Sequence, residues 1–215
     1  GKPFLIKYRV YSFENSVRTN FLDSEYGFIN PPSLFLFPEN YLDNKIEVLC
    51  ETNGHFKYIY SSLERKENLF FAANFDLLYD APIQFSNRES VSFESGNCQH
   101  EVLLEGEISN QTKATLVSDL KKITDYEAKL FGANPNKYYL FIINLTDSNY
   151  GGLEHSASSV NAFDPNKLHE KAEYAKLLGL LAHEYFHLWN VKRIRPIELL
   201  PFDYLTPNLT RELWI

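Results

Sequence analysis

The sequence lacks long apolar runs, long basic runs and methionine. No apolar stretch approaches the roughly 20 residues that a membrane-spanning helix needs, so we expect no transmembrane segment. The net charge is −7 and no basic run stands out, which excludes nucleic acid as an expected partner. The chain opens with Gly1 and shows no targeting segment, so we expect its first residue to be a processed or cut end.

Cysteine is also scarce, and this limits redox chemistry. The two cysteines, Cys50 and Cys98, form no C-x-x-C pair and lie far from the other candidate ligands. We expect both to be structural, either paired with each other or free.

Apolar and aromatic residues are plentiful. They make up 44% and 15% of the 215 residues, which is ample for a folded core in one large or two small domains. Residues 1–106 have the short alternating runs and frequent turns of β-structure. The candidate strands are residues 4–11, Leu34–Phe37, Ile46–Leu49, Phe56–Tyr60, Leu69–Ala72, Val91–Phe93 and Val102–Leu104.

The pattern changes to helical spacing after Gly106. Apolar residues at intervals of three and four predict an amphipathic helix over 112–130, and a compact apolar run predicts a buried strand over 138–145. Asp164 and Pro165 are typical of a helix start, so we expect a second long helix over 167–190, closed by Pro196.

This second helix carries the motif His183-Glu184-Tyr185-Phe186-His187. Two histidines four residues apart lie on one side of a helix, where both imidazoles can bind one metal ion. Glu184 is then placed to take a proton from a water molecule, which fits zinc best. The alternative is that both histidines are surface or hydrogen-bonded residues without a ligand role.

Longer stretches around this motif resemble the glycyl aminopeptidase family of zinc metallopeptidases, which are thermolysin-like gluzincins and distant relatives of aminopeptidase N. The stretches that carry the resemblance are Gly151–His155, His183–Pro196, Phe71–Asp76 and Ala81–Ile83. The resemblance implies an α+β fold. An N-terminal β-rich, sandwich-like domain would cover 1–106, and the first part of a thermolysin-like catalytic domain would cover 107–215.

The family pattern also implies roles for individual residues. His183 and His187 match the two zinc ligands, and Glu184 matches the general base. Glu154 matches the acidic residue that holds the free α-amino group of a peptide substrate. An ordinary loop carboxylate is the alternative. The same motif implies substrate-binding positions at Gly151, Gly152 and His155.

Other polar residues have open roles. His155 would orient Glu154 or line the pocket, but a packing or surface role is equally expected. Lys192, Arg193 and Arg195 would bind a substrate carboxylate, or form a solvated face paired with acidic neighbours.

The third zinc ligand of the family is a glutamate on a later helix, just beyond a segment that resembles Leu213-Trp214-Ile215. Glu198 and Glu212 are the acidic groups near the chain end, and neither matches the motif. We therefore expect the front part of a larger zinc aminopeptidase, inactive by itself, whose substrate is a peptide with a free N-terminus. Two alternatives remain: a zinc hydrolase with a non-peptide substrate on the same scaffold, and a non-catalytic binding module.

Overall fold

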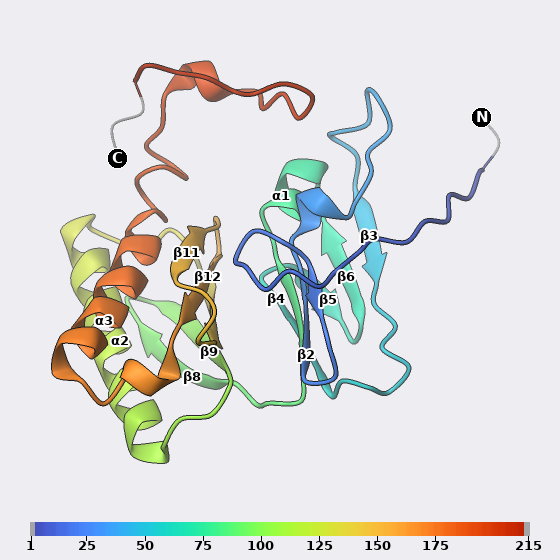
Figure 1. The fold of residues 1–215 in the computed structure, drawn as a ribbon. Coiled ribbons are helices and arrows are strands. Elements are labelled where there is room, and N and C mark those ends of the chain that lie inside the picture. The colour runs from blue at the N-terminus through green and yellow to red at the C-terminus, as the bar shows by residue number, and fades with distance from the viewer. Residues whose placement is uncertain (1–2, 213–215) are drawn as a thin grey trace.

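The structure is a computed structural model that describes residues 3–212. The fold is α+β, with two β-sheets in the N-terminal part followed by a third sheet and two long helices (Figure 1). The first sheet has the antiparallel order β1 (Phe21–Leu22), β2 (Tyr26–Ile29), β7 (Ile83–Ser86), β4 (Tyr58–Ser61). The second has the antiparallel order β3 (Ile46–Leu49), β6 (Leu69–Ala72), β5 (Glu64–Lys66).

A short helix, α1 (Phe75–Tyr79), connects these two sheets. Its start is capped by Asn74, whose side-chain oxygen accepts a hydrogen bond from the backbone N–H of Leu77 at 2.9 Å. Apolar residues of α1 share one buried cluster with residues of both sheets, including Phe70 and Ile83. Hydrophobic burial therefore fixes the position of α1 and of Asp80, the residue that ends it.

The third sheet has five strands in the order β11, β12, β10, β9, β8. Their bounds are β8 (Val91–Ser95), β9 (Cys98–Glu105), β10 (Tyr138–Leu145), β11 (Gly151–Glu154) and β12 (Ser158–Phe163). β10 is parallel to both β9 and β12, whereas β8 and β11 are antiparallel edge strands. The domain boundary expected at Gly106 remains a prediction, although β8 and β9, which precede it, pair within this third sheet.

The five-stranded sheet is buried on both faces. The helices α2 (Asn110–Leu130) and α3 (Lys171–Phe186) lie on one side and the N-terminal sheets on the other (Figure 1). Tyr139 and Phe141 of β10 pack in the cluster with the helices, while Leu140 and Ile142 pack in the cluster with the N-terminal strands. This two-sided burial explains why the 138–145 run is apolar throughout.

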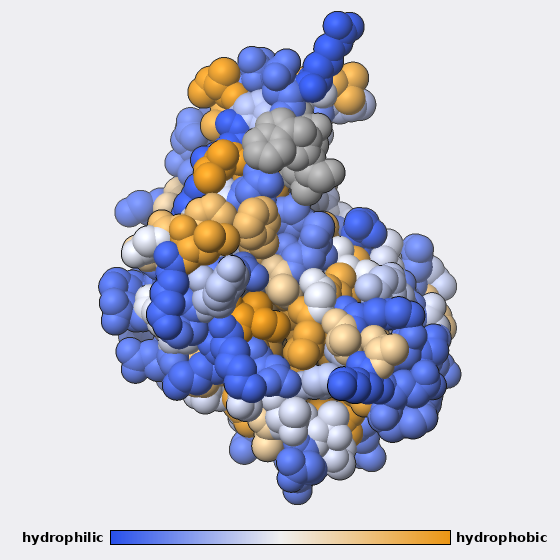
Figure 2. All heavy atoms as spheres, turned by 90° about the vertical axis from the view of Figure 1, so that its left-hand side faces the viewer, coloured by the Kyte–Doolittle hydropathy of each residue, from blue (hydrophilic) through white to orange (hydrophobic). Residues whose placement is uncertain are grey.

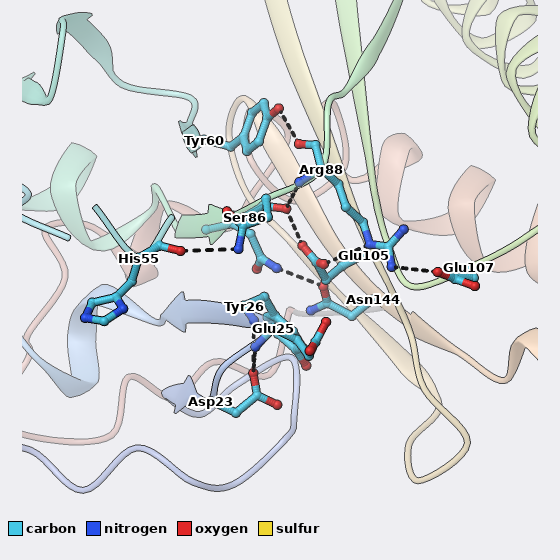
Figure 3. Close-up of polar contacts among 12 residues, drawn as sticks. Asp23, Glu25, Tyr26, His55, Tyr60, Ser86, Arg88, Glu105, Glu107 and Asn144 are labelled. Atoms are coloured by element: carbon cyan, nitrogen blue, oxygen red, sulfur yellow. Dashed lines mark hydrogen bonds and ion pairs between the residues drawn. The ribbon is translucent and has the colours of Figure 1, made fainter. Parts of the chain in front are cut away.

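Polar residues also join the two parts, at the carboxyl ends of β9 and β10 (Figure 3). The Ser86 hydroxyl donates to the Glu105 carboxylate at 2.6 Å, and Arg88 lies 3.3 Å from the same group. The Gln84 amide donates to Asn144 at 3.2 Å. Burial raises the pKa of Glu105, and the contacts with Ser86 and Arg88 partly oppose this rise. These hydrogen bonds and this ion pair fix the position of the segment 84–88 against the ends of β9 and β10.

Two predicted strands are wrong. Residues 4–11 are extended but belong to no strand of the described chain, and most of their side chains are exposed. Their alternating pattern needed a partner strand, and no strand described in residues 3–212 pairs with them. Residues 34–37 follow a 3₁₀ turn, Pro31–Ser33, and Phe35 and Phe37 pack onto the α1 core as loop residues.

The predicted helices are closer to the observed ones. α2 matches the expected 112–130 with two further residues, because the Ser109 hydroxyl caps it by accepting from the Thr112 N–H at 3.0 Å. The second helix was expected from 167 to 190, but α3 is shorter at both ends. Asp164 and Pro165 begin only a 3₁₀ turn, and tight turns replace the helix after Phe186.

The surface on the helix side is largely hydrophilic, with hydrophobic residues gathered near its middle and toward the C-terminal segment (Figure 2). None of the helices described between residues 3 and 212 is long and apolar enough to cross a lipid bilayer. Cys50 and Cys98 are both buried free thiols, and burial raises the pKa of each.

Candidate metal and substrate-binding site

The end of α3 brings His183 and His187 together. His183 lies in the last turn, and His187 caps the helix with φ −61° and ψ −15°, so the spacing of one helical turn is kept. Their Nε2 atoms are 3.1 Å apart and their rings meet edge to face. Two imidazole nitrogens bound to one tetrahedral zinc would lie about 3.3 Å apart. The observed separation is close to that value.

The orientation of His187 is fixed by the turn that follows the helix. Its Nδ1 donates to the backbone carbonyl of Asn190 at 2.6 Å. This contact assigns the proton to Nδ1 and leaves a lone pair on Nε2, the tautomer that a metal requires. His187 is buried, whereas His183 is exposed.

Glu184 is a residue of α3, and its side chain lies between this helix and the edge strand β11. It is 5% exposed, and its carboxylate rests against the backbone of Gly152. A Cβ at position 152 would come 2.2 Å from Glu184 Oε1, so the close approach requires glycine. Burial, reinforced by the negative charge of Glu154, raises the pKa of Glu184 to about 7, and Arg18 opposes the shift.

Glu154 is the last residue of β11, and its side chain lies close to those of Glu184 and His187. Ligand atoms of Glu154, Glu184 and His187 all lie within 4.8 Å of one another, and they form the group of converging ligand side chains found in residues 3–212. Glu198 and Glu212 do not join it. The segment Leu213–Ile215 lies outside the described residues.

His155 is buried but takes part in a different contact. Its Nδ1 lies 3.2 Å from the carboxylate of Asp80, which also accepts from Lys192 Nζ at 2.8 Å. Asp80 is a residue that the sequence analysis missed. It directly precedes the stretch Ala81–Ile83, but nothing in the local sequence indicates a partner 75 residues away.

The basic run after α3 is largely engaged within the protein. Lys192 pairs with Asp80, and Arg193 donates to the carbonyl of Leu188 at 2.6 Å and to Asn136 at 2.7 Å. The Arg195 guanidinium lies 5.4 Å from the centre of the Phe202 ring. Of the two roles considered for this run, pairing with an acidic neighbour is the one that Lys192 adopts.

A helix with paired histidines and a buried carboxylate, facing an edge strand, is an arrangement typical of metallopeptidases. The model of the Peptidase M61 N-terminal domain matches residues 1–87, and that of the M61 glycyl aminopeptidase matches residues 176–215. This chain belongs to the M61 glycyl aminopeptidase family. No curated protein sequence matches it.

Two solved structures share the fold of this chain. The chain is similar to a crystal structure of an aminopeptidase N family protein from Idiomarina loihiensis, with a TM-score of 0.88 and 29% identity over 95% of this chain. It spans 37% of the length of that protein. A second structure, Legionella pneumophila aminopeptidase A in complex with aspartic acid, shares the fold at 13% identity, with a TM-score of 0.55. That match covers 79% of this chain and 23% of the Legionella protein.

Proposed function

We propose that the protein is a zinc-dependent aminopeptidase that acts on peptides with a free N-terminus. The observation that carries this proposal is the convergence of Glu154, Glu184 and His187 between an edge strand and a helix end. His183 is not part of that group but lies beside His187. Family membership supports a metallopeptidase reaction, and the position of Glu154 at the end of the edge strand supports attack at the N-terminal bond.

His183 and His187 would hold the ion through Nε2, and Asn190 supports His187 from behind. A zinc ion bound there supplies a Lewis acid that polarises the scissile carbonyl and makes water easier to deprotonate. Glu184 would accept the proton of the attacking water and pass it to the leaving amine. Its raised pKa, caused mainly by burial, suits a group that must both take and return a proton near neutral pH.

Glu154 would bind the ammonium group of the substrate. A carboxylate and an ammonium form a charge-assisted hydrogen bond, and the partial burial of Glu154 reduces solvent screening of that bond. Among residues 3–212, β11 is an edge strand that pairs with β12 alone, so a substrate backbone can add to its other side beside Gly151 and Gly152. A contact between Glu154 and the terminal ammonium would fix the position of the first residue of the substrate, which favours removal of a single residue.

The described residues supply two histidines but no uncommitted third protein ligand. Glu154 and Glu184 are the acidic members of the converging group, and both have other proposed tasks. Catalytic zinc normally has three protein ligands. We therefore propose that residues 1–215 alone bind zinc weakly and have no useful turnover, and that a carboxylate from elsewhere in the natural protein completes the site.

The test is hydrolysis of aminoacyl anilides by the natural full-length protein, before and after chelation and after zinc is restored. Turnover that is lost with chelator and restored by zinc is the expected result. Zinc binding without hydrolysis of any aminoacyl anilide would favour the non-peptide hydrolase. A protein that neither binds zinc nor turns over substrate would favour the binding module.

A further inference from the structure

One carboxylate of the N-terminal domain contacts two segments that lie next to the candidate site, one after Glu154 and one after His187. Asp80 ends α1, and its Oδ2 accepts from the backbone N–H of Ser156 at 2.8 Å and also from the Ser156 hydroxyl. Its Oδ1 accepts from Lys192 at 2.8 Å and lies 3.2 Å from Nδ1 of His155. Four donors from two separate segments thus meet at one side chain.

The first segment is the hairpin turn that follows Glu154. The turn is closed by the N–H of His155, which donates to the carbonyl of Ser158 at 2.9 Å. Asp80 holds the two residues directly after Glu154, so it restricts the backbone on which the Glu154 side chain is mounted. Because that backbone lies at the end of an edge strand, it pairs with one neighbouring strand, β12, among the described residues.

The second segment is the turn that follows α3. Lys192 lies five residues after His187, and its N–H donates to the His187 carbonyl at 3.1 Å. Asn136 also links the same two segments. Its side chain donates to the carbonyl of Ser156 at 2.7 Å and accepts from Arg193 at 2.7 Å. The hairpin and the histidine-bearing turn are therefore linked through Asp80 and through Asn136.

We infer that Asp80 is a positioning residue of the N-terminal domain that sets the place of Glu154 relative to the two histidines. This role rests on the proposed function of Glu154 as the anchor for the substrate amine. Asp80 is too occupied by its four donors to bind substrate itself, and it acts through the backbone of residues 155 and 156. The N-terminal domain thereby takes part in selecting substrates with a free amine.

The chemistry of this contact requires a carboxylate. Burial would raise the pKa of Asp80, but hydrogen bonding from His155 and the charge of Lys192 outweigh it and hold that pKa below its ordinary range. Two charged oxygens accept from all four donors. An asparagine would keep one acceptor oxygen but turn an NH₂ group, which cannot accept, toward the remaining donors. Asp80→Asn therefore breaks part of the contact with little change of side-chain volume.

Amide hydrogen exchange on residues 1–215 without metal tests the structural half of this inference. Asp80→Asn should speed exchange at the Ser156 N–H at least tenfold and leave the amides of β10 unchanged, since those report global unfolding. The matched control is Asp76→Asn, which alters an aspartate of the same helix that bonds Tyr204 instead. Lys192→Met is a milder second variant and should give a smaller increase at Ser156. Unchanged exchange at Ser156 in both variants would overturn the inference.

Kinetics of the natural full-length protein tests the functional half. The ratio of kcat/KM for an aminoacyl anilide to that for its N-acetylated form should fall at least tenfold in Asp80→Asn, with zinc content unchanged. Adding Glu154→Gln should lower this ratio no further than Glu154→Gln alone, because Asp80 acts through Glu154.

Equal losses on both substrates, or effects that multiply in the double variant, would mean that Asp80 only supports the fold. A ratio unaffected by Glu154→Gln itself would overturn the proposed function of Glu154 and with it the role of Asp80. The exchange experiment would still report whether the contact forms.

Discussion

The carboxylate of Glu184 lies directly on the backbone of Gly152, where a Cβ would come 2.2 Å from Oε1. Gly152→Ala should therefore displace the Glu184 carboxylate from its place beside Glu154 and His187. We expect kcat of the natural full-length protein to fall at least tenfold, with zinc still bound. Gly179→Ala is the control, because nothing within 4 Å opposes a Cβ at that helical position. It should raise the free energy of unfolding by roughly 0.5–1 kcal/mol and leave kcat unchanged. Full turnover in Gly152→Ala would contradict the placement of Glu184.

Glu184→Gln tests the general base itself. Glutamine keeps the shape but cannot accept the proton, so turnover should fall by a factor of about 10² to 10⁴ while zinc content stays constant. Glu198→Gln is a suitable control, since Glu198 lies in a short exposed turn outside the converging group. Near-normal turnover in the Glu184 variant would rule out the base, and zinc loss in the Glu198 variant would identify an unexpected ligand.

Glu154→Ala should distinguish substrates by their N-terminus. Removing a charged hydrogen bond should weaken kcat/KM for free-amine substrates by about 1.5–3 kcal/mol, and N-blocked substrates should lose little. The comparison uses the same anilide with and without an N-acetyl group. If both forms lose equally, Glu154 does not anchor the amine.

Glu127 should make stability depend on pH. Burial raises the pKa of this α2 residue to about 8, and its Oε2 meets no hydrogen-bond partner in the described residues. Between about pH 4.5 and 8 the native state holds a proton that the unfolded chain releases. The free energy of unfolding should therefore fall as pH rises through this window.

Urea denaturation of metal-free residues 1–215 at pH 5 and pH 8.5 measures this change. Glu127→Gln should reduce the difference in the free energy of unfolding between the two pH values by roughly 4 kcal/mol. The neighbouring, more exposed Asp125 provides the control variant Asp125→Asn. An identical pH dependence in wild type and Glu127→Gln would contradict the assignment.

Zinc affinity should depend on a ligand beyond the two histidines. By calorimetry, residues 1–215 should bind zinc at least roughly 10- to 100-fold more weakly than the natural full-length protein. Loss of a residue that only hydrogen-bonds a metal ligand already costs about that much affinity. Circular dichroism should show α3 intact without metal, since Leu177, Leu181 and Tyr185 pack it into the core. Tight, stoichiometric zinc in residues 1–215 would mean that Glu212, Glu198 or Glu154 completes the site.

Much of the local structure followed from periodicity. The strands at 46–49, 69–72 and 138–145 and the helix that starts after Ser109 agree with their sequence patterns. Residues 4–11 show the limit of this reasoning. They have a strand-like pattern, but a strand also needs a partner edge, and pairing is decided by distant parts of the chain.

The sequence by itself determined that His183 and His187 share one side of a helical turn, because 3.6 residues per turn fixes that spacing wherever a helix forms. The resemblance of the Gly-Gly-Leu-Glu-His stretch to the family implied which carboxylate to expect near them. Only the tertiary structure decided that Glu184 would be wedged against Gly152 and that Asp80 would hold the turn after Glu154. Those contacts join residues 32 and 76 positions apart, and they exist because hydrophobic burial on both faces of one sheet brings the helix, the edge strand and the N-terminal domain together.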